Sequence, residues 1–122
     1  MNGLMKLECA LRNELMTTVR LATGGVCSVA GLNLDDSEDC KVCVTEALLL
    51  MKHRGYTTAS LTFVGGDGLT VIAEGRERDG EMSAPAEDEI SAALLSALAE
   101  SVVMDKREGE LYKITFRFGR EA

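Results

Sequence analysis

The segment from Thr58 to Gly75 constrains the fold most, because it holds two strand-like runs separated by a glycine-rich turn. The runs read TASLTFV and LTVIAEG, and the residues between them are Gly65-Gly66-Asp67-Gly68. Glycine supplies the positive φ that tight turns need, so this pattern predicts a β-hairpin rather than a phosphate-binding loop, which would lead into a helix. The middle of the chain is therefore expected to form antiparallel β-structure.

A first helix is predicted before this hairpin, from Glu14 to about Ala30, with Asn13 as its N-cap and apolar residues at helical spacing. The pair Gly24-Gly25 lies inside it, where each glycine costs about 1 kcal/mol relative to alanine. Such a pair indicates the close approach of another backbone, or a helix that bends or ends there.

A second helix is predicted from about Glu38 to His53, with Ser37 as its N-cap and acidic residues in its first turn, where the helix dipole favours them. Glu46 lies off its apolar stripe, beside Leu50, so the helix is expected to present a second, partly apolar face. The stripe itself comprises Cys40, Cys43, Val44, Ala47, Leu48 and Met51.

The C-terminal part of the chain predicts a loop over residues 76–89, a helix from Glu87 to about Ser101, and a final hairpin. The last strand of that hairpin, residues 111–118, alternates apolar and polar residues. With a short strand at Lys6–Leu11, the order is β-α-α-β-β-α-β-β. This order predicts a single α+β domain over residues 1–122, a two-layer sandwich whose mostly antiparallel sheet has its helices on one face.

Composition excludes some function classes. The 122 residues carry a formal net charge of −7, and the pI of about 4.7 argues against the basic surface that nucleic-acid binding requires. No apolar run approaches the roughly 18–20 residues that a membrane span needs, and no signal-peptide pattern is present. We expect a cytoplasmic protein with neither a nucleic-acid nor a membrane partner, whose four cysteines are reduced thiols.

The cysteine and histidine residues give no strong catalytic or metal motif. Cys40-x-x-Cys43 could bind zinc or take part in redox chemistry, but a structural zinc site needs four ligands and His53 is the only histidine. Both cysteines also lie on the apolar stripe, which favours buried core residues and predicts no metal site. No phosphate-binding GxxxxGK[ST] motif is present, and His53 has no Ser, Cys or Asp beside it in a recognisable catalytic arrangement.

Two charged residues on the predicted helices have alternative interpretations. Arg20 interrupts the apolar pattern of the first helix and is interpreted from the residues alone as a solvated charge. Glu46 could act as a general base toward a hydroxyl group or water within hydrogen-bond reach, although most helical glutamates simply face water.

The order and spacing of these elements resemble the histidine-kinase-like (GHKL, or Bergerat) ATPase domain over about residues 4–118. Among its members, the chain is most similar to the small bacterial anti-sigma-factor serine/threonine kinases. The resemblance is carried by LECALRNELMTTVRLATGGVCSVAGL, SEDCKVCVTEALLLMKHRGY, LTVIAEG and GELYKITFRF.

The resemblance implies that the second helix corresponds to the N-box of the family. There a glutamate activates the attacking hydroxyl or water, and an asparagine four residues later binds Mg²⁺ and the nucleotide phosphates. Glu46 matches the glutamate, but the asparagine position is Leu50, which offers no oxygen to a cation that takes oxygen ligands. The resemblance thus implies that Glu46 stands at the base position and that Leu50 stands where the family has its metal ligand.

The other nucleotide elements of the family also differ in this chain. In place of the D-x-G-x-G box stand Glu74 and Gly75, with Arg76 and Arg78 where glycines are expected, and the glycine-rich lid before the last helix has no G-x-G. Phosphoryl transfer depends on positioning and on a metal that neutralises charge. We therefore expect a degenerate site that holds no cofactor.

The resemblance then implies a non-catalytic regulatory module, expected to be a homodimer, that binds a sigma factor or the antagonist of an anti-sigma factor. By the same resemblance, Arg20 and the exposed part of the first helix lie where partner contacts form. The alternative is an active Mg-ATP-dependent serine/threonine kinase or ATPase, with Glu46 as general base and Glu74 at the adenine.

Overall fold

The computed structural model of the chain describes residues 2–119. Its elements, in chain order, are β1 (Asn2–Ala10), the 3-10 turn η1 (Asn13–Leu15), α1 (Met16–Val29), α2 (Leu34–His53), β2 (Arg54–Tyr56), β3 (Thr58–Gly66), β4 (Gly68–Gly75), β5 (Arg78–Met82), α3 (Glu87–Leu98), β6 (Ser101–Arg107) and β7 (Glu110–Phe118).

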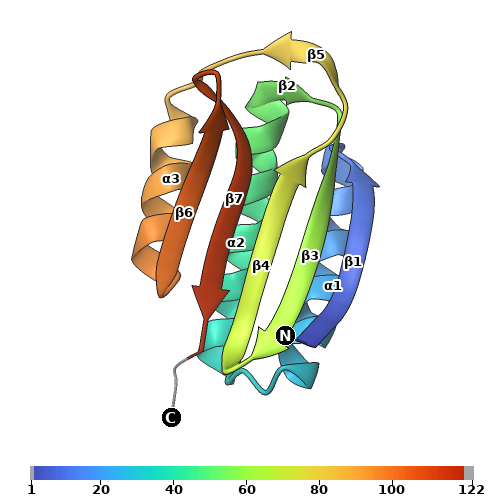
Figure 1. Cartoon of the computed structure of the whole chain (residues 1–122), viewed down its shortest axis with the longest axis vertical. Helices are drawn as coiled ribbons and strands as arrows, with labels where there is room; N and C mark the ends of the chain where they lie inside the picture. Colours follow the sequence, from blue (N-terminus) through green and yellow to red (C-terminus); the bar gives the residue numbers. More distant parts are fainter. Residues whose placement is uncertain (1, 120–122) are drawn as a thin grey trace.

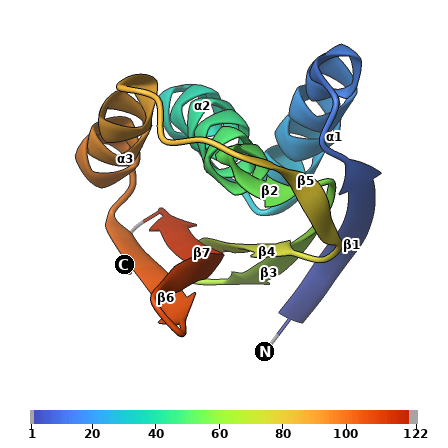
Figure 2. The same cartoon turned by 90° about the horizontal axis from the view of Figure 1, so that it is seen from above.

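The fold is an α+β two-layer sandwich, as predicted. Within residues 2–119 a five-stranded sheet has the order β1-β3-β4-β7-β6, and every neighbouring pair is antiparallel. The helices α1, α2 and α3 all lie on one face of this sheet, with α2 between the other two (Figures 1 and 2). No helix of this part of the chain has the length and apolar character that a membrane crossing requires.

The core lies between α2 and the middle strands. The predicted apolar stripe of α2 is fully buried along its whole length. It packs over inward-facing residues of β3, β4 and β7, among which the rings of Phe116 and Phe118 meet edge to face at 6.2 Å. Fully burying a large apolar side chain contributes about 1.5–3 kcal/mol, so this layer dominates the stability of the fold.

Both predicted hairpins are confirmed, and their turns show why glycine is needed. Gly66 and Gly68 on either side of Asp67 have φ values of 147° and 95°. The second turn, between β6 and β7, places Glu108 and Gly109 at φ values of 54° and 79°. Positive φ at two successive residues is the geometry of a type I′ hairpin turn, which suits the twist of the flanking strands.

Both predicted N-caps are wrong. The amide of Asp36 donates to the side-chain oxygen of Asn33 at 2.8 Å, so α2 begins at Leu34, one turn earlier than expected, and Ser37 lies inside the helix. The side-chain oxygen of Asn13 accepts from Nζ of Lys52 at 3.2 Å instead of capping α1, which follows a 3-10 turn. A distant lysine has therefore taken the oxygen that the local pattern assigned to the helix.

The loop predicted over residues 76–89 contains a strand, which is a further correction. β5 pairs antiparallel with β2 directly after α2, and together they cross the end of the sandwich where α2 ends and α3 begins (Figure 1). All residues of β5 are exposed. Backbone hydrogen bonds rather than apolar burial hold this strand, so the sequence carries no alternation that would reveal it. The predicted third helix also ends earlier, at Leu98.

The glycine pair of α1 does not end the helix, which continues to Val29. A Cβ atom at Gly24 would lie 2.8 Å from Cε of Lys41, whose aliphatic stem crosses α1 there. Gly25 has open space around it. The close approach indicated by the sequence is therefore real at Gly24, but a side chain of α2 makes it rather than another backbone.

Candidate functional site

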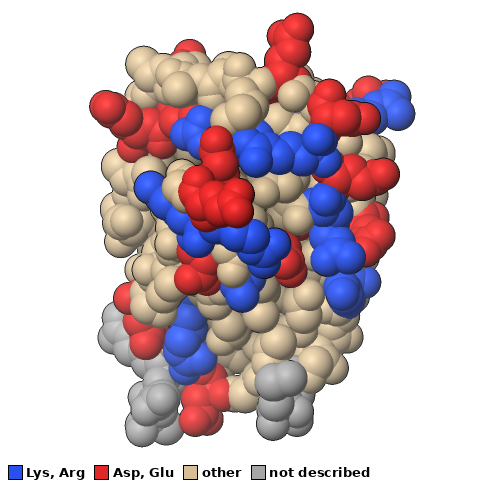
Figure 3. All heavy atoms as spheres, turned by 45° about the horizontal axis from the view of Figure 1, so that its top comes forward, with Lys and Arg blue, Asp and Glu red and all other residues tan. Residues whose placement is uncertain are grey.

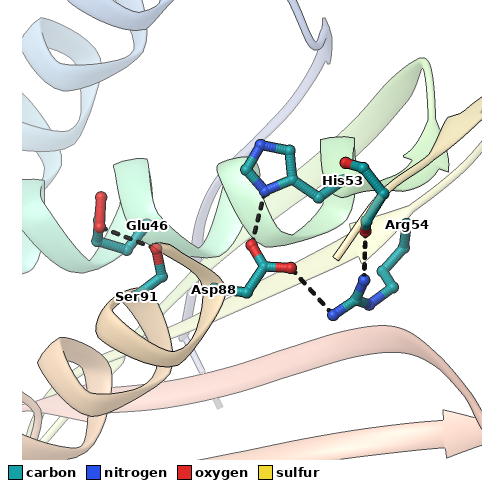
Figure 4. A network of polar contacts seen from close by, with 6 residues as sticks. Glu46, His53, Arg54, Asp88 and Ser91 are labelled. Atoms are coloured by element: carbon teal, nitrogen blue, oxygen red, sulfur yellow. Dashed lines mark hydrogen bonds and ion pairs between the residues drawn. The ribbon is translucent and has the colours of Figure 1, made fainter. Parts of the chain in front are cut away.

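A polar network joins the end of α2 to the beginning of α3 (Figure 4). Oδ1 of Asp88 lies 2.6 Å from Nδ1 of His53, and Oδ2 of Asp88 accepts from Nη2 of Arg54 at 3.1 Å. The other terminal nitrogen of Arg54 donates to the carbonyl oxygen of Ser83 at 2.7 Å. Asp88 is 8% exposed, so this is a buried carboxylate with both oxygens paired.

The helix ends favour the same arrangement. Asp88 lies in the first turn of α3, where a negative charge suits the helix dipole, and His53 lies in the last turn of α2, where a positive charge does. Among the hydrogen bonds of residues 2–119, none joins the His53 ring to a serine, threonine or cysteine side chain. The network therefore holds elements together and contains no nucleophile beside its histidine.

Glu46 belongs to a second link between the same helices. Its Oε1 accepts a hydrogen bond from Oγ of Ser91 at 3.0 Å, and Ser91 is buried (Figure 4). Glu46 lies two helical turns before His53, while Ser91 lies one turn after Asp88. The two contacts thus form one antiparallel seam, and the second face that the sequence predicted for α2 is the face that α3 covers.

Leu50 lies between these two links on α2, one turn after Glu46. It is 3% exposed and lines a cleft of about 480 Å³ between α2, α3 and the β6–β7 turn. Met104 and Leu111 contribute to the apolar part of this cleft, and Lys106 lies on its wall. The position that the resemblance assigns to a metal ligand is therefore a buried aliphatic side chain.

Gly75 ends β4 beneath an aromatic ring. A Cβ atom at this position would lie 2.5 Å from ring atoms of Tyr56, so the glycine allows the ring to pack directly on the strand. Tyr56 is 8% exposed, and the guanidinium of Arg78 lies 5.4 Å from its ring centroid. The Tyr56 side chain, which belongs to β2, thus fills the space above the end of β4.

Glu74 points the other way. Leu69, Val71 and Ala73 are buried toward the helices, and strand alternation places Glu74 on the opposite face of the sheet. Its cross-strand neighbours there are Ser60 and Lys113. Glu46 and Leu50 therefore lie one helical turn apart on α2, and Gly75 lies on the face of the sheet that the helices cover. The Glu74 side chain lies on the opposite face of the sheet.

Arg20 lies apart from the network, exposed on α1. It lines a shallow hollow of about 350 Å³ with Leu21 of the same helix and with Glu38 and Lys41 of α2. Nζ of Lys41 lies 2.8 Å from Oε2 of Glu38, and this hydrogen bond with its positive charge lowers the pKa of the Glu38 carboxyl. In Figure 2, α1 and α3 are at opposite ends of the helix layer.

The charges around the β2–β5 end are mixed in sign. In Figure 3, basic and acidic side chains are interleaved over the face shown, with no extended area of one sign. In the described part of the chain, no group of three or more His, Cys, Asp or Glu side chains is placed to hold a metal ion. Cys40 and Cys43 are fully buried free thiols, which confirms the core interpretation of this pair.

Sequence reasoning missed Asp88, Arg54 and Ser91. Asp88 stands between two other acidic residues, and nothing in that run marks it as the buried member. Its spacing of three residues from Ser91 would have placed both on one helix face, a weak signal without a known partner helix. Neither a scan of the sequence against models of known protein families nor a search of curated proteins gives a match.

Proposed function

We propose that this chain is a regulatory protein-binding module of the histidine-kinase-like (GHKL) ATPase fold, similar in role to bacterial anti-sigma factors and without phosphoryl-transfer activity. It acts in the cytoplasm as a homodimer and binds a sigma factor or the antagonist of an anti-sigma factor. The observation that carries the proposal is Leu50, a buried aliphatic side chain one helical turn after the glutamate at the base position.

The architecture supports the family. An antiparallel sheet with all helices on one face, and with the N-box-like helix α2 at the centre of the helix layer, agrees with what the resemblance implies. The resemblance extends to the chain order of the main helices and strands. This support is structural and concerns the fold rather than the activity.

The surroundings of the degenerate boxes support the loss of catalysis. The Glu46 carboxylate accepts a hydrogen bond from Ser91, the ring of Tyr56 lies on Gly75, and Glu74 lies on the far face of the sheet. A hard cation takes oxygen ligands, and Leu50 has none to offer. These contacts leave the Glu46 carboxylate, Gly75 and Glu74 engaged with this chain's own residues or turned away from the helices, which supports the loss of catalysis.

Nucleotide binding is tested by thermal unfolding with millimolar Mg-ATP or Mg-ADP, with EDTA added in the control. A ligand present at 100 times its Kd adds about 2.7 kcal/mol to the free energy of unfolding, which raises Tm by several degrees in a domain of this size. We expect no shift with either nucleotide. A magnesium-dependent rise in Tm would overturn the non-catalytic proposal.

Partner binding is tested with purified sigma factors and anti-sigma antagonists from the same genome, by titration against the immobilised chain. We expect one of them to bind, with Arg20→Glu weakening the complex by about tenfold or more because it reverses a contact charge. Arg12→Glu, at another exposed position, is the matched control and should leave Kd unchanged. If neither substitution changes Kd, α1 is not part of the interface. If no candidate protein binds, the proposed regulatory role is refuted.

One observation favours the active kinase as a second candidate. A cleft of about 480 Å³ lies beside Leu50, one helical turn from Glu46. In this alternative Mg-ATP occupies the cleft beside Leu50, and Glu46 activates a substrate hydroxyl. Transfer of labelled phosphate to a partner protein, abolished by Glu46→Gln, would establish it.

A further inference from the structure

A second cavity lies where the ends of β1 and α2 meet the β2–β5 pair. Its volume is about 620 Å³, larger than the cleft at Leu50, and the two hollows share no lining residue. Binding sites for small molecules occupy about 300–1,000 Å³ and combine an apolar lining with a few polar groups. This cavity therefore has the size of a small-molecule site.

Leu11 and Tyr56 give the cavity an apolar surface that the fold holds in place. Leu11 follows β1 and is 4% exposed, and the ring of Tyr56 rests on Gly75. The Tyr56 hydroxyl forms no hydrogen bond within residues 2–119, a region in which every buried side-chain polar atom has a partner. Solvent therefore reaches this hydroxyl, and it is available to a ligand.

Lys52 supplies a positive charge at the wall of the cavity, and a side chain from outside α2 holds it there. Its Nζ donates to Oδ1 of Asn13, in η1, at 3.2 Å. An ammonium group has three N–H donors, so two remain for a ligand. The asparagine that does not cap α1 thus fixes the position of a charge instead.

His53 gives the cavity a second fixed polar group. Its Nδ1 lies 2.6 Å from the Asp88 carboxylate, and Figure 4 shows the other ring nitrogen on the side of the ring away from Asp88. His53 lines this cavity, whereas Asp88 lines the cleft at Leu50. The contact with Asp88 therefore fixes the ring and leaves its second nitrogen for a hydrogen bond with a ligand.

The charges of the lining favour a ligand with one negative charge. Arg12 pairs with Glu14 at 2.9 Å and His53 is already paired with a carboxylate, so Lys52 is the cation whose printed partner within residues 2–119 is a neutral oxygen. The acidic residue of the lining, Glu81, is exposed and disfavours a second negative charge. A carboxylate carries one charge, whereas a phosphate group carries about −1.5 to −2 at pH 7.

We propose that this cavity binds a small monocarboxylate with an apolar body. The carboxylate pairs with the ammonium group of Lys52, and the apolar body lies on Leu11 and Tyr56. The Tyr56 hydroxyl and the second ring nitrogen of His53 offer further hydrogen bonds. The site requires neither a metal ion nor the partner binding proposed above, so it stands or fails independently of them.

The deciding experiment titrates the unaltered chain with millimolar benzoate or hexanoate, in the presence of EDTA, and follows the backbone amides by NMR. We expect saturable shifts at Leu11, Thr57 and Gly80, with the amides of Ala92 and Gly109 at the Leu50 cleft unchanged. Benzamide, which lacks the charge, and phenyl phosphate, which carries more of it, should each bind about tenfold or more weakly than benzoate. No shift with either acid, shifts confined to the Leu50 cleft, or equal binding of benzamide or phenyl phosphate would overturn the proposal.

Variants test the role of Lys52 in the same titration. Lys52→Met keeps an apolar stem of similar length and removes the charge, so the Kd for benzoate should rise about tenfold or more, and Lys52→Arg should recover most of the affinity. Lys6→Met, at an exposed position of β1, is the matched control and should leave Kd unchanged. Thermal unfolding verifies that each variant folds. The same Kd in Lys52→Met and the unaltered chain, or an equal loss in Lys6→Met, would refute the assignment of the carboxylate to Lys52.

Discussion

Nδ1 of His53 lies 2.6 Å from Oδ1 of Asp88, and this contact fastens the last residue of α2 to the first turn of α3. The second oxygen of the same carboxylate binds Arg54, whose guanidinium also reaches the backbone at Ser83, next to β5. A single aspartate therefore connects a helix end, a helix beginning and the two strands that cross this end of the sandwich.

Replacing Asp88 with alanine should destabilise the fold strongly. The change leaves the donors of His53 and Arg54 without their carboxylate in a largely buried setting, and we expect a loss of about 2–4 kcal/mol in the free energy of unfolding. Urea unfolding measures it. Glu89→Ala, at the next and exposed position, is the control and should change stability by less than about 0.5 kcal/mol. Similar losses in the two variants would show that the network contributes nothing.

Restoring an asparagine at Leu50 should not restore nucleotide binding. Leu50→Asn places an amide among apolar side chains and removes buried methyl groups, so we expect a loss of about 2–4 kcal/mol. Leu50→Met, which conserves volume, should cost less than about 1.5 kcal/mol. Both are measured by urea unfolding with and without Mg-ATP. If Mg-ATP recovers the stability of Leu50→Asn alone, a nucleotide space survives beside α2.

The packing of Tyr56 on Gly75 should appear as a coupling energy between the two positions. Gly75→Ala places a methyl group 2.5 Å from the ring and should cost about 1–3 kcal/mol, but much less when Tyr56 is already alanine. Gly25→Ala is the control, because this helical position has open space around it and should gain about 0.5–1 kcal/mol. Additive costs at the two positions would refute direct packing.

Stability should fall in alkaline solution because of Cys43. Its pKa rises from an ordinary value of 9.0 to about 12 on folding, chiefly through burial, so the unfolded thiol loses its proton first. The contribution is fully present below pH 9 and declines above it by at most about 1.4 kcal/mol per pH unit. Urea unfolding at pH 8 and pH 10.5 should therefore show a smaller loss in Cys43→Ala than in the unaltered chain. An equal loss in both would contradict the shift.

The parts of the fold that local pattern determines were predictable from the sequence. The hairpins were marked by glycines at positions that need positive φ, and the α2 stripe by apolar residues at helical spacing. β5 was not predictable, because an exposed strand held by backbone hydrogen bonds leaves no apolar alternation, and its partner β2 is only three residues long. The predicted caps were wrong at both helices, because Asn13 binds Lys52 from another helix and because Asn33 caps α2 one turn before Ser37.

The candidate site was predictable only in part. The sequence placed Glu46 and Leu50 on one helix and gave α2 a second face, but it did not identify α3 as the element that covers that face. Strand alternation alone could have placed Glu74 on the far face of the sheet. Every second residue of β4 from Leu69 to Ala73 is buried, and Glu74 falls between these positions in the alternation. The role of Asp88 was not predictable, because it depends on a contact with His53, which is far away in the chain. A single sequence does not show such contacts.

The sheet has a register shift in each of its two outermost strands, between Gly3 and Met5 in β1 and between Asp105 and Lys106 in β6. An outermost strand presents unpaired amide and carbonyl groups that another chain can pair with, and a bulge or a charged side chain interrupts that template. Here Lys6 follows one irregularity, and Lys106 and Arg107 follow the other. Both borders of the sheet thus discourage the strand-by-strand stacking through which β-rich proteins aggregate.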